Sequence, residues 1–382
     1  MGFIDRIKER AKADKKTIVL PESMDKRTFA AAEKVLKEGI ANLIIIGTPE
    51  EIAENSKGYD ISGAKIIDPY TYEKTEDYIN LFVELRKAKG LTYEDAKKTA
   101  LEDYMYYACL MVKAGDADGV VSGACHSTAN TLRPSLQIIK TKPGVKLVSA
   151  FFLMVVPNCE YGADGTFIFA DSGLEQNPDP EKLAAIAACS AESFELLAEK
   201  EAIVAMLSHS TKGSAKHADV DKVVEATKIC KENNPNLKVD GELQLDAAIV
   251  PSVGESKAPG STVAGKANVL VFPDLDAGKP HRIGTGKGQK LTFALITLMG
   301  SYSNTKPRER RFSLGVCTRT QRLIQSQDKS SFQPYQTADC MFCGGSPVRL
   351  AAFLSAQRQH RHKPCVYGYD CRHAALFPAC HV

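Results

Sequence analysis

Short apolar runs alternate with amphipathic stretches through the first third of the chain, and this alternation constrains the fold more than any other feature. The apolar runs lie at residues 16–21, 42–47, 65–69 and 119–122. Short runs rich in Val and Ile and bounded by Gly or Pro are typical of buried strands. Because apolar residues recur at helical spacing between these runs, the pattern predicts a doubly wound α/β unit with a parallel sheet.

A second α/β unit is predicted after residue 146. Apolar runs at residues 147–156 and 165–171 are joined by a polar loop, which favours an antiparallel pair. We therefore expect two doubly wound α/β domains, 1–144 and 145–277, with the site in the cleft between them. In the second domain we expect helices at 180–199, 217–233 and 243–250, and strands at 202–207, 237–240 and 268–272.

The composition changes abruptly after residue 277. Residues 1–277 carry 33 Lys and Arg against 42 Asp and Glu, whereas residues 278–382 carry 16 against 4. The second segment also holds six of the 11 cysteines. Such a break marks a boundary. Residues 301–349 show no sustained helical or strand period, so we expect residues 278–382 to form an irregular or disordered tail.

Several features predict a cytoplasmic protein without a membrane partner. The chain has no apolar run of the roughly 18 residues that a membrane-spanning helix needs. Its first residues follow an amphipathic helical pattern and not that of an apolar signal core. The five cysteines of residues 1–277 have no disulfide-like spacing, which indicates reduced and mostly buried thiols.

The stretch at residues 118–134 is a candidate anion site. A short strand turns at Gly123 and passes through small hydroxyl residues into a helix that carries Arg133. Such a turn offers backbone N–H groups to an anion, and an arginine adds a bidentate grip on phosphate. The alternative is an ordinary strand–helix turn in which Ser127 or Thr128 caps the helix. The residues of this stretch leave both interpretations open.

Other candidates lie in loops rich in small, hydroxyl and basic residues, at 208–216 and 256–266, and at Arg86. None matches a named phosphate-binding motif. His126 has the chemistry of an acid or base, although a histidine in a loop more often has a structural role. Asp164 and Asp171 could act as a base and an ion partner, although acids in turns are usually solvated.

Seven segments, in this order, resemble a known family. They are residues 118–134, 158–166, 169–173, 208–216, 240–248, 256–266 and 272–275. Residues 1–277 are similar to the phosphate acetyl/butaryl transferase family, and within it to phosphate acetyltransferases, also called phosphotransacetylases. The resemblance implies a homodimer of two-domain α/β subunits whose architecture is like that of isocitrate and isopropylmalate dehydrogenases.

The resemblance also implies an activity, the reversible transfer of an acetyl group between coenzyme A and inorganic phosphate. Acetyl-CoA, CoA, phosphate and acetyl phosphate would be the partners, with no cofactor and no metal. Arg86 and Arg133 match the arginines on the phosphate side. The positions that line the substrate and CoA cleft match Ser127, Thr128, Thr131 and Lys257.

The family pattern stops where the composition changes. The family's base aspartate and its Ser-Arg pair are not found in residues 278–382. Codons for residues 313–320, with allowed synonyms, can be read in a shifted frame as a segment like the missing one. We therefore hypothesise that much of residues 278–382 is an out-of-frame reading, and we expect impaired activity. Sequencing the gene tests this hypothesis.

Two alternative functions remain open from the sequence. A different acyl pocket would make the chain a phosphate butyryltransferase. The basic tail would suit a non-enzymatic zinc- or nucleic-acid-binding fusion, with candidate zinc ligands at Cys340, Cys343, His360, His362, Cys365, Cys371 and His373. The spacing of these cysteines fits no standard zinc finger, and we expect no nucleic-acid partner.

Overall fold

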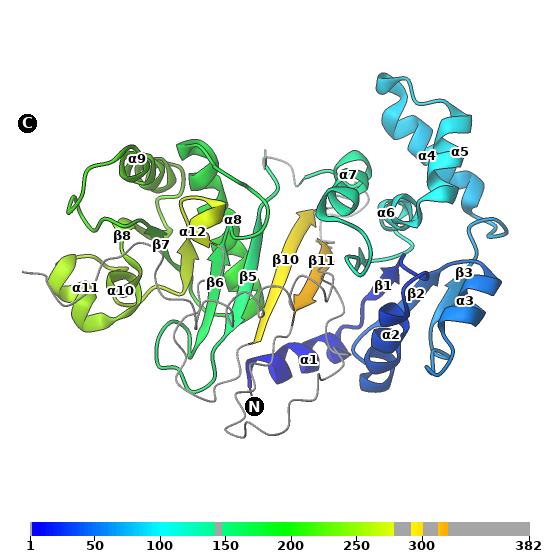
Figure 1. Cartoon of the computed structure of the whole chain (residues 1–382), viewed down its shortest axis with the longest axis horizontal. Coiled ribbons are helices and arrows are strands. Elements are labelled where there is room, and N and C mark those ends of the chain that lie inside the picture. Colours follow the sequence, from blue (N-terminus) through cyan, green and yellow to red (C-terminus); the bar gives the residue numbers. More distant parts are fainter. Residues whose placement is uncertain (1, 142–146, 279–291, 301–311, 320–382) are drawn as a thin grey trace, which may run out of the picture. The chain divides into compact units, whose positions relative to one another are not determined.

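The computed structural model describes residues 2–141, 147–278, 292–300 and 312–319, the last two ranges as backbone only. Its strands form two sheets (Figure 1). The first sheet has the order β3-β2-β1-β4, and each neighbouring pair is parallel. Its strands are β1 (Thr17–Leu20), β2 (Asn42–Ile46), β3 (Lys65–Ile67) and β4 (Gly119–Val120). The predicted parallel α/β unit is thus confirmed.

Helices alternate with the strands of this first sheet. The sequence pattern of residues 92–114 predicts one long helix, but the structure has two helices that meet at Asp103. The Asp103 side chain accepts a hydrogen bond from the backbone N–H of Met105, so it caps a new helix. The helices are α2 (Lys26–Glu38), α3 (Pro49–Asn55), α4 (Thr75–Arg86), α5 (Tyr93–Glu102), α6 (Tyr104–Ala114) and α7 (Thr128–Ile138), with a 3₁₀ turn at Lys87–Lys89.

Helix α6 is the most buried helix of this unit. It is apolar on nearly every side, and Tyr107 and Leu110 are fully buried. A helix that is apolar all round must be covered by other elements, and α4, α5 and α7 pack on it. α6 therefore fixes α4 and α7 next to each other, which matters because Arg86 and Arg133 lie on these two helices.

The second sheet is mixed, with the order β11-β10-β5-β6-β9-β7-β8. The predicted antiparallel pair is confirmed as β5 and β6, and the pairs β6–β9, β9–β7 and β7–β8 are parallel. Its elements up to residue 278 are β5 (Ala150–Val155), β6 (Thr166–Ala170), α8 (Pro180–Ala198), β7 (Ile203–Leu207), α9 (Ala218–Asn233), β8 (Lys238–Leu243), α10 (Leu245–Ile249), α11 (Pro251–Lys257), β9 (Val269–Val271) and α12 (Leu275–Gly278).

Two further strands extend this sheet, β10 (Thr292–Gly300) and β11 (Phe312–Arg319). β10 pairs antiparallel with β5 and with β11. They lie in the segment for which the sequence predicts an irregular or disordered tail. The predicted domain boundary near residue 144 falls outside the described residues and stays a prediction.

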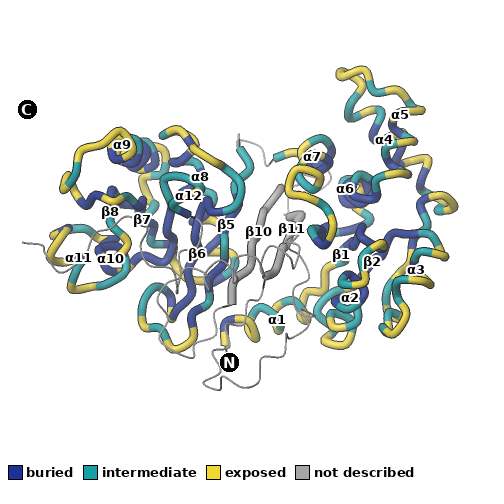
Figure 2. The backbone as a smooth tube through the Cα atoms, viewed as in Figure 1, coloured by how far each residue is buried: buried dark blue, intermediate teal, exposed yellow. Residues whose placement is uncertain are grey.

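The core of the second unit lies between its sheet and its long helices. The strands are buried while the outer helix faces are exposed (Figure 2). Phe194 of α8 is fully buried in this core, and Phe3 of α1 (Phe3–Ala13) belongs to the same cluster. Arg10 of α1 donates hydrogen bonds to the carbonyl oxygens of Leu196 and Leu197, at 3.0 Å each.

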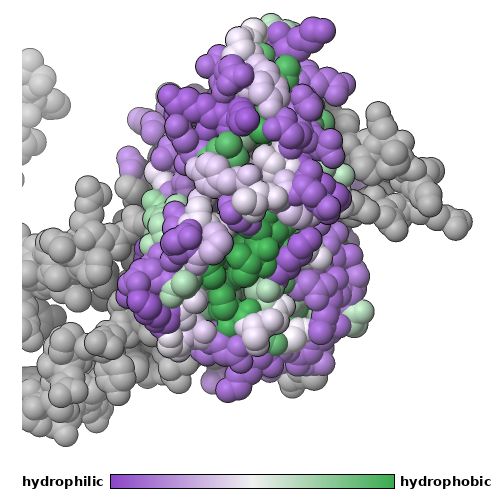
Figure 3. Space-filling model, turned by 90° about the vertical axis from the view of Figure 1, so that its right-hand side faces the viewer, coloured by the Kyte–Doolittle hydropathy of each residue, from purple (hydrophilic) through white to green (hydrophobic). Residues whose placement is uncertain are grey.

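The edge strand β3 of the first sheet is short and begins with a lysine. Ile66 on it is 40% exposed, and Tyr70 just after it is 58% exposed. The face drawn in Figure 3 carries an apolar patch bordered by polar surface. A short edge strand with a lysine is a poor template for pairing with another chain.

No helix in the described part of the chain is both long and apolar enough to span a membrane.

Candidate active site

The loop after β4 turns at Gly123 and holds four backbone N–H groups toward one carboxylate. Gly123 has a φ of 125°, a conformation that side chains disfavour. Its N–H and that of Ala124 donate to Oε2 of Glu22 at 2.9 and 2.8 Å. The N–H groups of Cys125 and His126 donate to Oε1 of Glu22 at 2.9 and 2.8 Å. The loop therefore binds an internal anion.

Glu22 reaches this loop because β1 and β4 are parallel neighbours, and Glu22 follows the carboxyl end of β1. Its side chain is 1% exposed. Burial raises the pKa of Glu22, but the hydrogen bonds from His126, Cys125 and Ala124 outweigh this and lower it to about 2. The carboxylate is therefore ionised at neutral pH.

His126 lies between two carboxylates. Its Nδ1 is 2.8 Å from Oε1 of Glu22, and its Nε2 is 3.7 Å from Oδ1 of Asp103. Asp103, Cys125 and Glu22 raise the pKa of His126 to about 11. The imidazole is therefore protonated at neutral pH and is not a general base there. Of the two roles that the sequence left open for His126, the structure supports the role within the loop.

These contacts correct the expectation of a backbone anion site. The N–H groups of residues 123–126 are already bound to Glu22 and are not free to bind an external phosphate. The capping alternative is confirmed at Ser127, whose Oγ accepts the N–H of Asn130 at 3.2 Å. Thr128 is the first residue of α7 and not its cap. An external anion would have to use the side chains of α7 and its first N–H groups.

Ser127 provides a small test of this local geometry. We expect Ser127→Ala to lower the free energy of unfolding by about 1 kcal/mol, the usual value of an N-cap. Chemical denaturation of the two proteins measures the difference. Ser127→Asp keeps a capping oxygen and should restore most of the loss. If both variants unfold like the parent, the cap at Ser127 does not stabilise α7.

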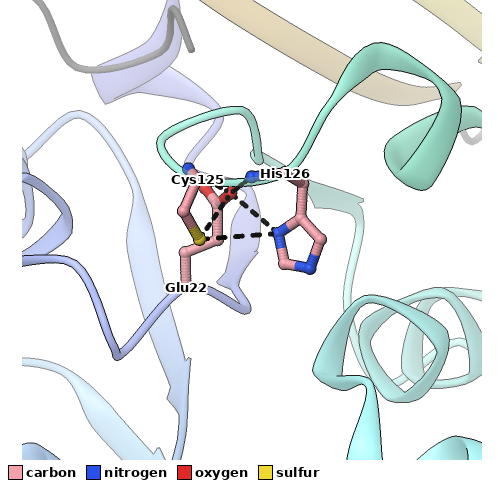
Figure 4. A group of neighbouring side chains, drawn as sticks. All are labelled: Glu22, Cys125 and His126. Carbon is pink, nitrogen blue, oxygen red and sulfur yellow. Dashed lines mark hydrogen bonds and ion pairs between the residues drawn. The ribbon is translucent and has the colours of Figure 1, made fainter. Parts of the chain in front are cut away.

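Glu22, Cys125 and His126 also group three potential metal ligands (Figure 4). Sγ of Cys125 is 3.4 Å from Oε1 of Glu22 and 3.9 Å from Nδ1 of His126. However, the two oxygens of Glu22 already accept four backbone N–H groups and the imidazolium. A metal would have to displace a proton from a nitrogen with a pKa of about 11. We therefore interpret the group as a closed ion pair.

The ion pair of Glu22 and His126 should make stability depend on pH. The pKa of Glu22 is lowered from 4.5 to about 2, so its stabilisation is present above pH 4.5 and is lost as pH falls through 2. The pKa of His126 is raised from 6.5 to about 11, so its stabilisation is present below pH 6.5 and is lost as pH rises through 11. We expect the contribution of the pair to be largest between pH 4.5 and 6.5. Thermal unfolding of the parent and of His126→Gln across pH measures it, and parallel curves would contradict it.

Two arginines on neighbouring helices, Arg86 and Arg133, act through their charges on the same phenol, that of Tyr106. Burial and the charge of Asp103 raise the pKa of Tyr106, and the charges of Arg133 and Arg86 oppose that rise. Arg86 is the last residue of α4, and Arg133 is exposed on α7. Within the described residues, neither guanidinium forms a hydrogen bond or an ion pair. The structure thus brings together these two predicted arginines, and it places Thr131 on the same helix as Arg133.

The second and third predicted loops also meet, in the second unit. Asp240 in β8 accepts a hydrogen bond from Nζ of Lys212, in the loop at residues 208–216, at 2.7 Å. It accepts another from Oγ of Ser261, in the loop at residues 256–266, at 2.6 Å. Burial raises the pKa of Asp240, but the hydrogen bonds of Lys212 and Ser261 outweigh this and lower it to about 2. Glu242 is 3% exposed and accepts the hydroxyl of Ser210 at 2.9 Å. As in the first unit, internal carboxylates hold a hydroxyl-rich loop.

Lys257 is exposed at the end of α11. Its Nζ donates to Oε1 of Gln244 at 3.0 Å and to Oδ2 of Asp246 at 2.8 Å. The side chain of Gln244 contacts Thr211 as well, so Lys257 lies beside the loop at residues 208–216. A surface pair of this kind is weak, and a phosphate group can compete for the lysine.

Several carboxylates of the structure were not singled out from the sequence. Glu22, Asp103 and Glu242 are the clearest cases. One feature of the sequence could have indicated Glu22: this acid directly follows Pro21, which ends a buried strand. The two candidate acids of the sequence, Asp164 and Asp171, have structural roles. Asp164 pairs with Lys200 on the surface, and Asp171 is buried and accepts three backbone N–H groups, with its pKa raised by burial.

Comparisons with known proteins agree with this fold. The sequence pattern of the phosphate acetyl/butaryl transferase family matches residues 2–296. The phosphate acetyltransferase of Acetivibrio thermocellus is 57% identical over 278 residues, which are 73% of this chain and 83% of that protein. The one of Thermoanaerobacterium thermosaccharolyticum is 56% identical over 278 residues, 73% of this chain and 84% of that protein.

Solved structures give the same picture. The EutD phosphotransacetylase from Staphylococcus aureus is 39% identical, with a TM-score of 0.67 over 76% of this chain and 89% of that one. A phosphotransacetylase from Streptococcus pyogenes is 42% identical, with a TM-score of 0.67 over 76% and 88%. The family match and these relatives thus define an acyltransferase. The chain belongs to the phosphate acetyl/butaryl transferase family.

Proposed function

We propose that the chain is a phosphate acetyltransferase that interconverts acetyl-CoA and phosphate with acetyl phosphate and CoA. The observation that carries this is a pair of guanidinium groups, Arg86 and Arg133, whose charges act on the same phenol and which have no hydrogen-bond or ion-pair partner among the described residues; Arg133 shares α7 with the hydroxyls at its start. Guanidinium groups bind phosphate oxygens bidentately. Ser127, Thr128 and Thr131 would then contact the acyl phosphate. Family membership and the named relatives support the same reaction.

The chemistry assigns a role to each group. In the direction of acetyl-CoA synthesis, the CoA thiolate attacks the carbonyl carbon of acetyl phosphate and phosphate leaves. Arg86 and Arg133 would stabilise the charge on the leaving phosphate. Lys257, which is exposed and contacts Asp246 and Gln244, would bind a phosphate of CoA. A thiol with a pKa near 8.5 needs a base to ionise at neutral pH, and His126 is already protonated there.

The setting of the enzyme is part of the proposal. We propose that it acts in the cytoplasm as a homodimer, with CoA as a substrate and with no bound cofactor. The resemblance to the family supports this setting. Sedimentation analysis of the purified full chain tests the homodimer.

Ligand binding tests the proposed function apart from turnover. Isothermal titration of the full chain with inorganic phosphate and with CoA should show both binding. Formation of acetyl phosphate, trapped as its hydroxamate, measures transfer, and we expect it to be slow because the family's base aspartate was not found. A chain that binds neither ligand would overturn the proposal.

A further inference from the structure

We propose that Glu22 is a positioning residue of the substrate site, which sets the start of α7 by holding the loop at residues 123–126. This rests on the proposed function, because Ser127 and Arg133 of α7 are the groups that would contact phosphate. Glu22 itself is buried and lies under the loop, so it acts through the loop. Its carboxylate would contact no substrate.

The segment after β1 binds both the N–H groups and a carbonyl oxygen of this loop. Glu22 binds the N–H groups, as described above. The carbonyl oxygen of Ala124 accepts a hydrogen bond from Nη2 of Arg27. Asp25 in turn orients Arg27, with 2.6 Å between its Oδ2 and Nη2. Residues 22–27 therefore hold the backbone of the loop from its donor side and from its acceptor side.

The residues that Glu22 binds lie directly next to the start of α7. His126 is the last residue that Glu22 binds, and the next residue, Ser127, caps α7. Thr131 donates its backbone N–H to the carbonyl oxygen of Ser127 at 3.0 Å. A shift of His126 would therefore move the cap and the first turn of the helix. Arg133 lies in the second turn, so its guanidinium would move as well.

A neutral side chain cannot replace the carboxylate of Glu22. The amide that Glu22→Gln introduces would offer one acceptor oxygen to the donors that now share two, and its NH₂ group would face N–H groups of the loop. Buried donors without an acceptor are costly, so the loop would rearrange or open. Aspartate at this position would keep the charge on a shorter side chain and should keep part of the contacts.

The test compares variants of the full chain by two measurements. The first is hydrogen–deuterium exchange of peptides that cover residues 122–133, and the second is the affinity for inorganic phosphate by calorimetry. We expect Glu22→Gln to speed the exchange of these peptides and to weaken phosphate binding by at least tenfold, with Glu22→Asp in between. Formate should restore phosphate affinity to Glu22→Ala, because its carboxylate can occupy the vacated space.

Asp116→Asn is the matched control. Asp116 accepts the hydroxyl of Tyr78 at 2.7 Å and pairs with Lys74, away from the loop. Its loss should destabilise the same unit without faster exchange at residues 122–133. Unchanged exchange in Glu22→Gln, or equal effects in both variants, would overturn the proposal. A parent chain that binds neither phosphate nor CoA would refute the proposed function, while the exchange measurement would still decide whether Glu22 holds the loop.

Discussion

Replacing residues 279–382 with the C-terminal segment of the Acetivibrio thermocellus phosphate acetyltransferase is expected to raise the rate of acetyl transfer by ~10²–10⁴-fold, the usual contribution of a positioned general base. The family's base aspartate was not found in residues 278–382, and His126 cannot serve in its place at neutral pH. The relative is 57% identical over the matched part, so its segment should fit this chain. Hydroxamate trapping of acetyl phosphate measures the rate.

The control for this chimera carries asparagine in place of the transplanted base aspartate. It should fold like the chimera, as judged by circular dichroism and thermal unfolding, and should lose most of the gain. A parent chain that already works at the rate of the relative would contradict the expectation. A chimera that folds but gains nothing would show that the described residues do not form the rest of the site.

Arg133→Ala is expected to weaken phosphate binding by about 10- to 150-fold. A hydrogen bond to a charged group contributes about 1.5–3 kcal/mol, and Arg133 has no competing partner among the described residues. Arg86→Ala should have a similar effect, because both guanidinium groups act on the same phenol of Tyr106. Calorimetric titration with inorganic phosphate measures both losses.

Arg10→Ala is the control for these two variants. Arg10 is also an exposed arginine, but its guanidinium binds the carbonyl oxygens of Leu196 and Leu197. Removing it lowers the net charge by the same amount and should leave phosphate affinity within about twofold of the parent. A comparable loss in all three variants would show that phosphate responds to net charge alone. Arg133→Lys should recover only part of the affinity, because lysine lacks the forked geometry.

Much of the fold could be predicted from the sequence. Along most of the chain, the spacing of apolar residues and the positions of Gly and Pro indicate the same helices and strands. Strands such as β2 and β7 are short apolar runs between turns, and their helices carry clear apolar stripes. The break at Asp103 escaped because both sides of it are helical and no Gly or Pro marks it. β10 and β11 were not predicted, because β10 joins the sheet through a long-range contact with β5 that local patterns do not contain, and β11 joins it through β10.

The site could be predicted only in its exposed part. The hydroxyl-rich loops stand out in the sequence, and so do Arg86 and Arg133, because residues 1–277 contain only five arginines. The carboxylates that hold these loops were not, because one acid among many carries no local signal. Glu22 meets the loop at residues 123–126 only after β1 and β4 pair, across about a hundred residues of chain. The anion for that loop was thus found in the chain itself.

The internal carboxylates at Glu22 and Glu242 have a consequence for the kinetics of ligand capture. Because each loop has its partner before any substrate arrives, binding need not order the backbone, and the entropic cost of association falls. Association should then be limited by diffusion and steering, with little dependence on a slow conformational step. Such a site is preformed, so ligands of different affinity should differ mainly in their dissociation rates.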